Sequence, residues 1–394
     1  MGASFWPEFF RRELDRLEGL GLRRRIPELD RGADRWVDSP RGRLLNLASN
    51  NYLGLAGTPE LKDAAVRAVR EYGTSSGASR LVSGQYALLD RLEAEAAALK
   101  ETQDALAVGS GYAANVLLLQ ALGGRHAVIF SDRLNHASIV DGIRLSGSDM
   151  ERYRHADAAH LAELLERHRG RERKIVVTDT VFSMDGDLAP LKEIAALCRE
   201  DDALLVLDEA HATGVFGQGR GLGYELGVAG DNVLFMGTLG KALGAHGAFI
   251  AGSREAVDFL RNTGRGFIFS TALPPAAVGA ALAGVRAVAR DPSLGSRLLD
   301  MAADLRAFLV GLDFDTGASA CQIVPVILGP NETALRARDF LAGRGVLAPA
   351  VRPPTVPAGT ARLRLSLRAD LTDADLDLTR AALADLREAM SAWT

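Results

Sequence analysis

The first twenty residues carry apolar side chains three or four positions apart, at the period of an α-helix. The positions are Phe5, Trp6, Phe9, Phe10, Leu14, Leu17 and Leu20. We therefore expect an amphipathic helix over residues 5–20, whose apolar face needs a packing partner. A loop rich in Gly and Ser separates a second predicted helix, at 60–72, from a charged helix that begins after Gln85.

Short apolar runs alternate with helical segments through the middle of the chain. The runs lie at 105–108, 127–131, 174–179, 203–208, 233–236 and 248–251. Uninterrupted apolar runs suit strands that are buried on both faces. Because helices lie between most of them, the pattern predicts an α/β fold with a mostly parallel central sheet sandwiched by helices. In such sheets ligands bind at the carboxyl ends of the strands.

The pattern changes near Asp291, after a predicted helix that runs from the two prolines at 274–275 to about Arg290. The remainder predicts a smaller α+β unit with strands near 324–328 and 362–367. We expect three parts: an N-terminal helix and extended segment at 1–48, a large α/β domain at 49–290 and a small C-terminal α+β domain at 291–394.

Composition places the chain among ordinary globular proteins. Of its 394 residues, 47% are hydrophobic and 24% are charged, with a net charge of -4. A near-neutral balance gives no electrostatic footprint for nucleic acid. The two cysteines, Cys198 and Cys321, are too few for a disulfide framework and lack zinc-site spacing, so we expect a reducing compartment and no metal.

No stretch of the sequence predicts a signal peptide or a membrane span. The first 17 residues carry several charges where a signal peptide needs an apolar core. Two uncharged stretches, 105–124 and 266–285, contain polar residues or a pair of prolines and suit a buried interior. We therefore expect a cytoplasmic protein.

Two glycine motifs match other enzyme classes. Residues 73–77 match the G-x-S-x-G elbow of hydrolases, but that elbow follows a strand and here a helix precedes it. Residues 109–114 follow a predicted strand, open a helix and precede a strand ending at Asp132, as in Rossmann folds. Spacing alone leaves a dinucleotide, another phosphorylated cofactor and an empty βα turn open for this motif.

Two further features place chemistry at the ends of buried strands. The sequence Asp208-Glu-Ala-His211 copies a DEAH box, but the chain lacks the Walker A loop that a nucleotide-driven motor needs. Lys241 follows another strand among glycines, where an apolar setting lowers the pKa of an amine and makes it a better nucleophile. Taken singly, a solvated lysine remains the commoner interpretation.

Together, the acid, the lysine, the glycine turn and Asn135-His136 suit pyridoxal phosphate (PLP), which needs a lysine for its Schiff base and an acid at its pyridine nitrogen. Eight ordered motifs accompany them: SNNYLGL, SGYAAN, NHASI, VFSMDGD, DEAHATGVFGQGRG, TLGKALG, FSTALPP and RPPTVPAGTARLR. On these motifs, nearly the whole chain resembles the α-oxoamine synthase family of fold-type I PLP-dependent enzymes. Within it, the last motif most resembles the members that join L-alanine to a pimeloyl thioester in biotin biosynthesis.

The resemblance implies a role for each matching residue. Lys241 is expected to form the Schiff base and then act as the base at the substrate Cα, while Asp208 pairs with the pyridinium nitrogen. The other implied cofactor contacts are His136 stacked on the ring, Ser183 and His211 at its phenolic oxygen, and Gly111, Tyr112 and Thr238 at the phosphate. Ser270 and Thr271 are expected to reach the phosphate from the other subunit, which implies a homodimer with shared sites.

The resemblance also implies substrate contacts. Arg364 is expected to anchor the amino-acid carboxylate with help from Asn50, because a guanidinium suits a planar anion. Arg23 and Thr355 match positions that face the acyl substrate, although Arg23 also fits a solvated basic patch. The acyl donor is expected to be pimeloyl-CoA or pimeloyl-acyl carrier protein, and the sequence leaves that choice open.

Three alternatives remain at this point. A sister synthase would condense glycine or serine with another acyl-CoA. A Rossmann oxidoreductase would leave Lys241 and Asp208 without roles. A non-catalytic subunit of a synthase complex would be free to lose the lysine that this chain retains.

Overall fold

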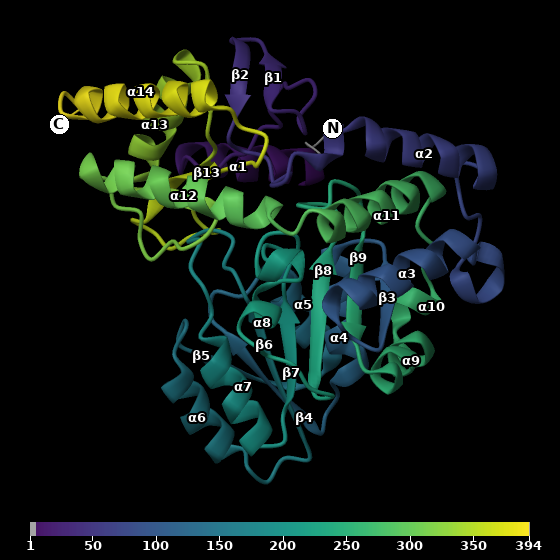
Figure 1. Ribbon diagram of the computed structural model, residues 1–394. Helices are drawn as coiled ribbons and strands as arrows, with labels where there is room; N and C mark the ends of the chain where they lie inside the picture. Colours follow the sequence, from purple (N-terminus) through teal and green to yellow (C-terminus); the bar gives the residue numbers. More distant parts are fainter. Residues whose placement is uncertain (1–4, 394) are drawn as a thin grey trace.

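The computed structural model describes residues 5–393, in which a central sheet lies below two small sheets and their helices (Figure 1). Residues 1–4 of the predicted N-terminal segment and Thr394 of the predicted C-terminal domain lie outside the described residues.

The central sheet has seven strands in the order β3-β9-β8-β7-β6-β4-β5. They are β3 (Asp104–Val108), β4 (Ala127–Asp132), β5 (Asp149–Tyr153), β6 (Arg173–Asp179), β7 (Leu204–Asp208), β8 (Val233–Thr238) and β9 (Ala248–Gly252). Neighbours pair in parallel except at β9, which runs antiparallel to β3 and β8. The predicted mostly parallel sheet is confirmed, and each of the six apolar runs forms one of its strands.

Strand β5 was not predicted, because its sequence DMERY is largely polar. It lies at the edge of the sheet and pairs only with β4. Most of its residues are partly or fully exposed. An edge strand that does not bury both faces lacks the apolar run by which the other strands are recognised.

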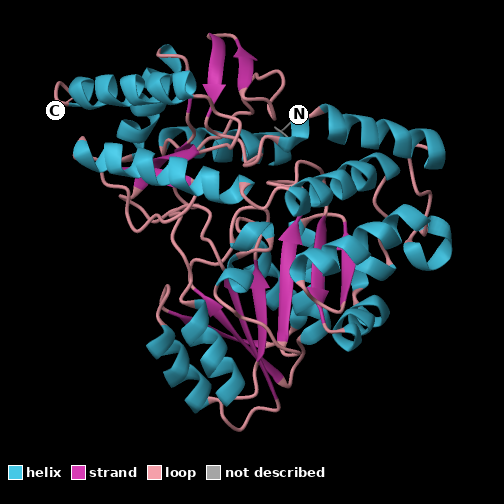
Figure 2. Cartoon of the chain, in the orientation of Figure 1, coloured by secondary structure: helices cyan, strands magenta, loops and turns pink. Residues whose placement is uncertain are grey.

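Helices cover both faces of the central sheet (Figure 2). They are α3 (Ala87–Lys100), α4 (Gly111–Leu122), α5 (Ala137–Ser146), α6 (Ala158–Arg167), α7 (Leu191–Glu200), α8 (Leu222–Glu225), α9 (Arg254–Thr263), α10 (Arg265–Ile268) and α11 (Pro275–Arg290). Successive strand residues point to opposite faces, so Leu205 and Leu207 enter one buried cluster while Val206 enters the other. The sheet therefore separates two apolar cores and contributes side chains to both.

Segments from the beginning and the end of the chain build the smaller part of the molecule (Figure 1). One small sheet contains β1 (Trp36–Ser39), β2 (Gly42–Asn46) and β11 (Val346–Leu347), and the other contains β10 (Ile323–Gly329), β12 (Ala350–Val351) and β13 (Ala361–Ser366). The helices beside them are α12 (Leu294–Gly311), α13 (Asn331–Gly343) and α14 (Asp373–Met390). Because β2 pairs in parallel with β11, the N-terminal segment shares a sheet with the C-terminal unit. The division at 48 and 290 stays a prediction.

The predicted first helix is present as α1 (Phe5–Gly19), and the second as α2 (Pro59–Tyr72). The apolar face of α1 finds no partner among the described residues of this chain. No residue of α1 is buried, and Phe5, Trp6 and Phe10 are exposed. The helical period follows from the local sequence, whereas burial depends on what the rest of the fold places beside the helix.

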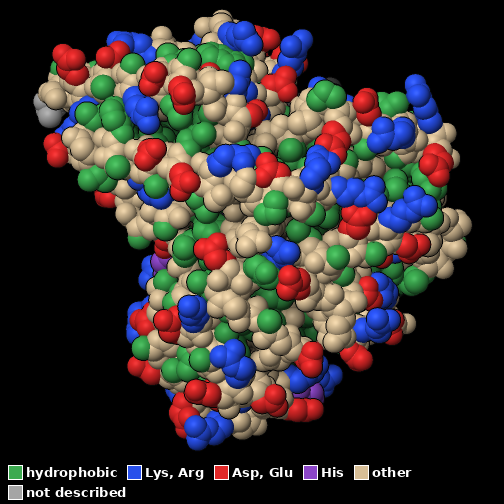
Figure 3. Space-filling model, in the orientation of Figure 1, with side chains coloured by type: hydrophobic (Ala, Val, Ile, Leu, Met, Phe, Trp, Pro, Cys, Tyr) green, Lys and Arg blue, Asp and Glu red, His purple; other side chains and the backbone are tan. Residues whose placement is uncertain are grey.

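The face of the molecule seen in Figure 3 carries acidic and basic side chains interspersed with one another. This face has no continuous basic surface of the kind that binds nucleic acid. Among residues 5–393, no helix combines the length and the apolar character that crossing a membrane requires.

Candidate active site

A cavity of about 180 Å³ opens at the carboxyl ends of β7 and β8, where an α/β sheet presents its ligands. Its lining brings together residues that lie far apart in the sequence: Gly111, Tyr112, Asn115, His136, Ser138, Asp179, Ser183, Asp208, Ala210, His211, Met236, Thr238 and Lys241. Eight of these were singled out from the sequence: Gly111, Tyr112, His136, Ser183, Asp208, His211, Thr238 and Lys241.

Lys241 follows β8 in a tight loop and points its amine at an imidazole. The Nζ atom lies 2.8 Å from Nε2 of His211. Burial lowers the pKa of Lys241 to about 8, although the charges of Asp208 and Asp179 oppose that shift. Gly244 makes the loop possible, because it has a φ of +69° and a Cβ there would lie 2.6 Å from the backbone nitrogen of Ala56.

His211 connects the lysine to a buried tyrosine. Its Nδ1 atom lies 2.6 Å from the hydroxyl of Tyr52, so both ring nitrogens have a partner. Burial lowers the pKa of His211 well below its usual range, and the neighbouring charges of Lys241 and Arg364 lower it further. The imidazole is therefore neutral near pH 7 and is held in one orientation.

Asp208 is the last residue of β7 and is only 3% exposed. Its Oδ2 accepts a hydrogen bond of 2.7 Å from Nδ2 of Asn115, and its Oδ1 accepts one of 2.9 Å from the backbone of Ala210. These two donors fix the carboxylate at the floor of the cavity. A carboxylate has about four acceptor positions, so it retains capacity for a charged donor from a ligand.

His136 stands at the N-terminus of α5. Its Nδ1 lies 2.7 Å from Oγ of Ser138, and its backbone N–H donates to Asp179 at 2.7 Å. Burial lowers the pKa of the His136 ring. Burial and the neighbouring Asp208 raise the pKa of Asp179 well above its usual range. Asp179 therefore orients the imidazole through the main chain, without needing a full negative charge.

The opposite side of the cavity suits a phosphate. Helix α4 begins at Gly111, and the side chain of Ser110 caps it by accepting from the backbone of Ala113. The free backbone N–H groups of the first turn attract an anion. Thr238 adds a hydroxyl group, which now donates to the carbonyl of Gly247 at 3.1 Å.

Arg364 lies on β13 behind His211 and is held by four neighbours. Its Nε donates to the carbonyl of Ser183 at 2.6 Å, and Nη1 donates to Asn50 at 3.1 Å and to Ser366 at 2.7 Å. Its Nη2 donates to the Tyr52 hydroxyl at 3.2 Å. One of its five N–H donors therefore remains, on Nη2.

Six predicted site residues do not line this cavity: Arg364 and Asn50, whose contacts are given above, and Ser270, Thr271, Arg23 and Thr355. Ser270 and Thr271 are exposed and line a separate hollow with Arg80 and Gly109. Arg23 forms an ion pair with Glu18 at 3.2 Å. Thr355 accepts a hydrogen bond of 3.3 Å from Arg24, the residue that follows Arg23.

Sequence reasoning missed three residues of this network: Tyr52, Asn115 and Asp179. Two of them lie in recognised motifs, SNNYLGL and SGYAAN, but neither had been given a role. Asp179 is the last residue of a predicted strand, as Asp208 is, and this position could have identified it as a site residue. Asp179 and Asp208 are partners in the register of β6 and β7, so the two carboxylates lie close together.

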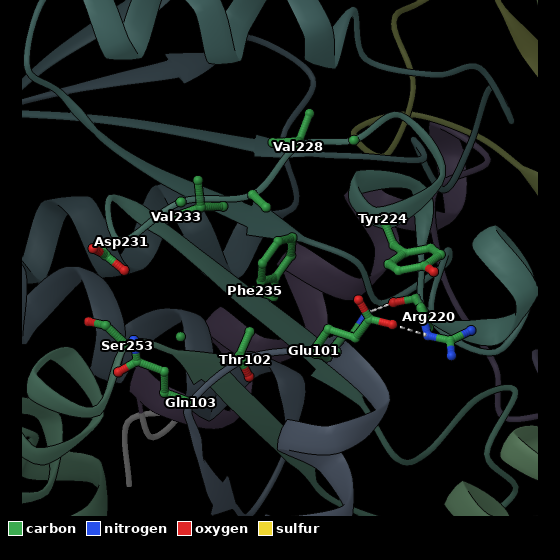
Figure 4. A pocket seen from close by; sticks show the side chains of 15 residues that line it. Glu101, Thr102, Gln103, Arg220, Tyr224, Val228, Asp231, Val233, Phe235 and Ser253 are labelled. Carbon is green, nitrogen blue, oxygen red and sulfur yellow. Dashed lines mark hydrogen bonds and ion pairs between the residues drawn. The ribbon is translucent and has the colours of Figure 1, made fainter.

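A different cavity, of about 320 Å³, lies at the opposite end of β8, near its first residue Val233. Figure 4 shows Glu101 and Arg220 pointing toward each other at its rim, and their Oε1 and Nε atoms are 3.2 Å apart. None of the predicted cofactor residues lines it. The chemistry therefore gathers at one end of the sheet.

Comparison with known proteins agrees with this arrangement. The model of the class I and II aminotransferase family matches residues 43–383. The 8-amino-7-oxononanoate synthase of Geobacter metallireducens is 51% identical over 377 residues, which cover 94% of this chain and 95% of the relative. The chain belongs to the 8-amino-7-oxononanoate synthase family. A second synthase of this name, from Anaeromyxobacter dehalogenans, is 49% identical and covers 94% of each chain.

Solved structures share the fold. A serine palmitoyltransferase from S. paucimobilis, with a bound PLP-myriocin aldimine, aligns with a TM-score of 0.92 and 27% identity over 99% of this chain and 100% of that one. The 8-amino-7-oxononanoate synthase of Francisella tularensis aligns with a TM-score of 0.76 and 27% identity, covering 88% and 98%. The predicted fold class is confirmed, and this member of the 8-amino-7-oxononanoate synthase family is a PLP-dependent, acyl-transferring enzyme of biotin biosynthesis. The hydrolase and Rossmann alternatives are thereby set aside.

Proposed function

We propose that the enzyme condenses L-alanine with a pimeloyl thioester of CoA or acyl carrier protein, with loss of CO2, to give 8-amino-7-oxononanoate and a free thiol. The observation that carries the proposal is the convergence of Lys241 and Asp208 on one cavity that a buried guanidinium borders. The names of the relatives support the product.

The residues of the cavity fit PLP. Lys241 is the covalent partner, Asp208 holds the pyridine nitrogen, and the start of α4 binds the phosphate through the backbone of Gly111 and Tyr112 and the hydroxyl of Thr238. His136 covers the ring, while Ser183 and His211 reach its phenolic oxygen. When bound, the cofactor withdraws electrons from the substrate Cα and so stabilises negative charge there.

Proton transfer at Cα falls to Lys241. A pKa of about 8 leaves a useful fraction of the amine neutral near pH 7, so that Lys241 is able to accept a proton. Its neighbour His211 is also neutral and is oriented by Tyr52, which keeps the amine directed into the cavity. The near-neutral pKa of the base thus follows from its burial.

The amino-acid carboxylate binds at Arg364 in this proposal. Arg364 retains one N–H donor on Nη2, and Asn50 contacts its Nη1, so we assign both side chains to the carboxylate. Bonds to Ser183, Ser366 and Tyr52 hold the guanidinium in place before the substrate arrives. Such preorganisation reduces the ordering cost of binding.

A neighbouring cavity of about 230 Å³ suits the acyl chain. It is lined by Leu22, Arg24, Met184, Ala350, Val351, Arg352, Pro353 and Thr355. Met184 of this cavity follows Ser183 of the catalytic cavity in the sequence. Burial and the charges of Arg338 and Arg24 lower the pKa of Arg352. These cations repel one another, and a bound anion would reduce that repulsion. We propose that Arg24 and Arg352 bind the distal carboxylate of pimeloyl, with Thr355 beside them and Arg23 outside.

We also propose a cytoplasmic homodimer in which Ser270 and Thr271 complete the phosphate site of the partner subunit. The exposure of both residues, away from the lysine cavity of their own chain, supports this assignment. Light scattering of the purified holoenzyme should give twice the mass of one chain.

A product assay with several amino acids and acyl thioesters tests the proposed reaction. L-alanine with a pimeloyl thioester should give the highest kcat/KM, with CO2 and thiol released one to one. A clearly better rate with serine and a long-chain acyl-CoA, the pair suggested by the serine palmitoyltransferase neighbours, would replace the substrate assignment and leave the family intact.

The variant Arg352→Met tests whether the acyl cavity recognises the distal carboxylate. It should raise the KM for a pimeloyl thioester at least tenfold, while the KM for an acyl thioester without a distal carboxylate stays unchanged. An equal rise for both donors would remove Arg352 from carboxylate recognition.

A further inference from the structure

A histidine outside the cavity lies between two aspartates. Nδ1 of His155 is 3.0 Å from Oδ1 of Asp132, and its Nε2 is 2.7 Å from Oδ2 of Asp187. Burial alone would lower the pKa of His155, but the two carboxylates outweigh it and raise the pKa to about 10. With an acceptor at each ring nitrogen, the ring is a cation at neutral pH.

The two aspartates lie at the start of, or within, the two loops that carry His136 and Ser183. Asp132 ends β4, and its carboxylate also accepts from the backbone of Leu134 at 2.8 Å, at the start of the loop to His136. Asp187 belongs to the loop 181–188, whose ends pair with each other. This second loop carries Ser183.

Residues of the small part of the molecule also form hydrogen bonds with the loop 181–188. Arg364 donates to the carbonyl of Ser183 at 2.6 Å, and the backbone of Ala320 donates to the carbonyl of Gly186 at 2.9 Å. Arg362 binds the carboxylate of Asp185. The position of this loop therefore decides where the Nε end of Arg364 is anchored.

We propose that His155 is a positioning residue for amino-acid binding: it ties the Ser183 loop to the end of β4 and so sets the guanidinium of Arg364. The ring does not line the cavity and does not touch the reacting atoms. The His155 ring packs edge to face with the ring of Phe182, and their centroids are 4.4 Å apart. Phe182 is the residue before Ser183, so this contact also links His155 to the Ser183 loop. The proposal rests on the carboxylate role of Arg364 in the proposed function.

The test is His155→Gln in the holoenzyme, because glutamine keeps hydrogen-bonding capacity and removes the charge. Titration with L-alanine, followed by the visible absorbance of the cofactor, should show a Kd about tenfold higher than in the wild type. The kcat should stay within about threefold, and the KM for the acyl thioester should not change. A loss confined to amino-acid binding, with kcat unchanged, is the signature of an interaction made equally in the ground state and the transition state.

His168→Gln is the matched control. His168 is also paired with an acid, Glu151, at 2.8 Å, but it lies beside edge strand β5 and does not line the cavity. This variant should leave amino-acid binding unchanged. If His155→Gln folds poorly, Asp187→Asn removes one charge of the same cluster and should give a smaller rise in Kd.

The pH dependence of stability provides a readout for the charge itself. A histidine whose pKa is raised on folding stabilises the protein fully below its unfolded pKa near 6.5 and loses that contribution as the pH approaches 10. The difference in Tm between wild type and His155→Gln should therefore shrink between pH 7 and pH 10.

The proposal is overturned if His155→Gln lowers Tm while the Kd for the amino acid stays at the wild-type value. It is also overturned if His168→Gln raises that Kd equally. Failure of the wild type to bind L-alanine while it binds glycine or serine would instead contradict the proposed substrate. In that case the ratio of Kd values for the amino acid that binds still decides the role of His155.

Discussion

Two lysines bind residues of the segment that follows β7, and only one of them is suited to catalysis. Lys100, at the end of α3, forms a buried ion pair with Glu209 and donates to Thr213 at 2.9 Å and to the carbonyl of Arg220. All three of its N–H donors have a partner. Lys241 instead faces a cavity, and its hydrogen-bonding neighbour is the neutral ring of His211.

Burial lowers the pKa of both lysines, but their neighbours differ. At Lys100 burial lowers the pKa, and the adjoining carboxylate of Glu209 opposes that shift through both its charge and its hydrogen bond. At Lys241 the pKa falls to about 8. Burial of a lysine is therefore insufficient evidence of reactivity, and the identity of its hydrogen-bond partners decides.

Neighbouring residues of the chain serve the two lysines. Asp208 and Glu209 follow one another at the end of β7, where successive side chains point to opposite sides. Asp208 accepts from Asn115 in the catalytic cavity, whereas Glu209 binds Lys100 and accepts from the backbone of Gly223 at 2.7 Å. One strand end thus supplies an acid to the proposed catalytic cavity and a second acid that pairs with Lys100.

Removing the catalytic lysine should have the largest effect on turnover. Lys241→Ala deletes both the covalent partner of the cofactor and the base, so kcat should fall by about 10⁴-fold or more. Borohydride reduction of the wild type, followed by peptide mass mapping, should place the pyridoxyl group on Lys241. Its appearance on Lys100 or elsewhere would reverse the comparison between the two lysines.

Asp208→Asn should be the next most damaging change. The variant keeps the bond to Asn115 but no longer holds a protonated pyridine nitrogen, so kcat and kcat/KM should fall together by about 100-fold. Circular dichroism should show an unchanged fold. Near-normal turnover would show that Asp208 does not stabilise the developing charge.

Lys100→Met should change stability rather than chemistry. It leaves the carboxylate of Glu209 buried without its cation, which costs about 3 to 5 kcal/mol of unfolding free energy. Urea unfolding measures this loss, and kcat per cofactor-loaded molecule should stay within about threefold. The double variant Lys100→Met/Glu209→Gln removes the unpaired charge and should recover part of the stability.

The pH dependence of cofactor attachment gives the finest distinction. The neutral amine attacks the aldehyde, and with a pKa of about 8 its fraction rises roughly tenfold per pH unit below pH 8 and then levels off. Stopped-flow mixing of apoprotein with PLP should therefore show a rate that levels off near pH 8. A rate that keeps rising toward pH 10 would indicate that Lys241 is an ordinary solvated lysine.

Much of the fold is readable from the sequence, because burial on both faces of a sheet demands apolar runs. The six runs became strands, and helices α2, α3 and α11 begin and end close to their predicted positions. Strand β5 escaped prediction because its edge position does not demand an apolar sequence. The apolar pattern of α1 predicted a helix but not its exposed location.

The sequence by itself singled out Lys241, Asp208 and His211 as candidates for the chemistry, because each stands at the end of a buried strand or within three residues of it. Only the tertiary structure decided what surrounds them. The bond between Tyr52 and His211 joins positions 159 residues apart, and that between Arg364 and Ser183 joins positions 181 apart. Likewise Arg24, and not Arg23, contacts Thr355. Contacts of this kind depend on how separate elements pack, which no local pattern of residue types records.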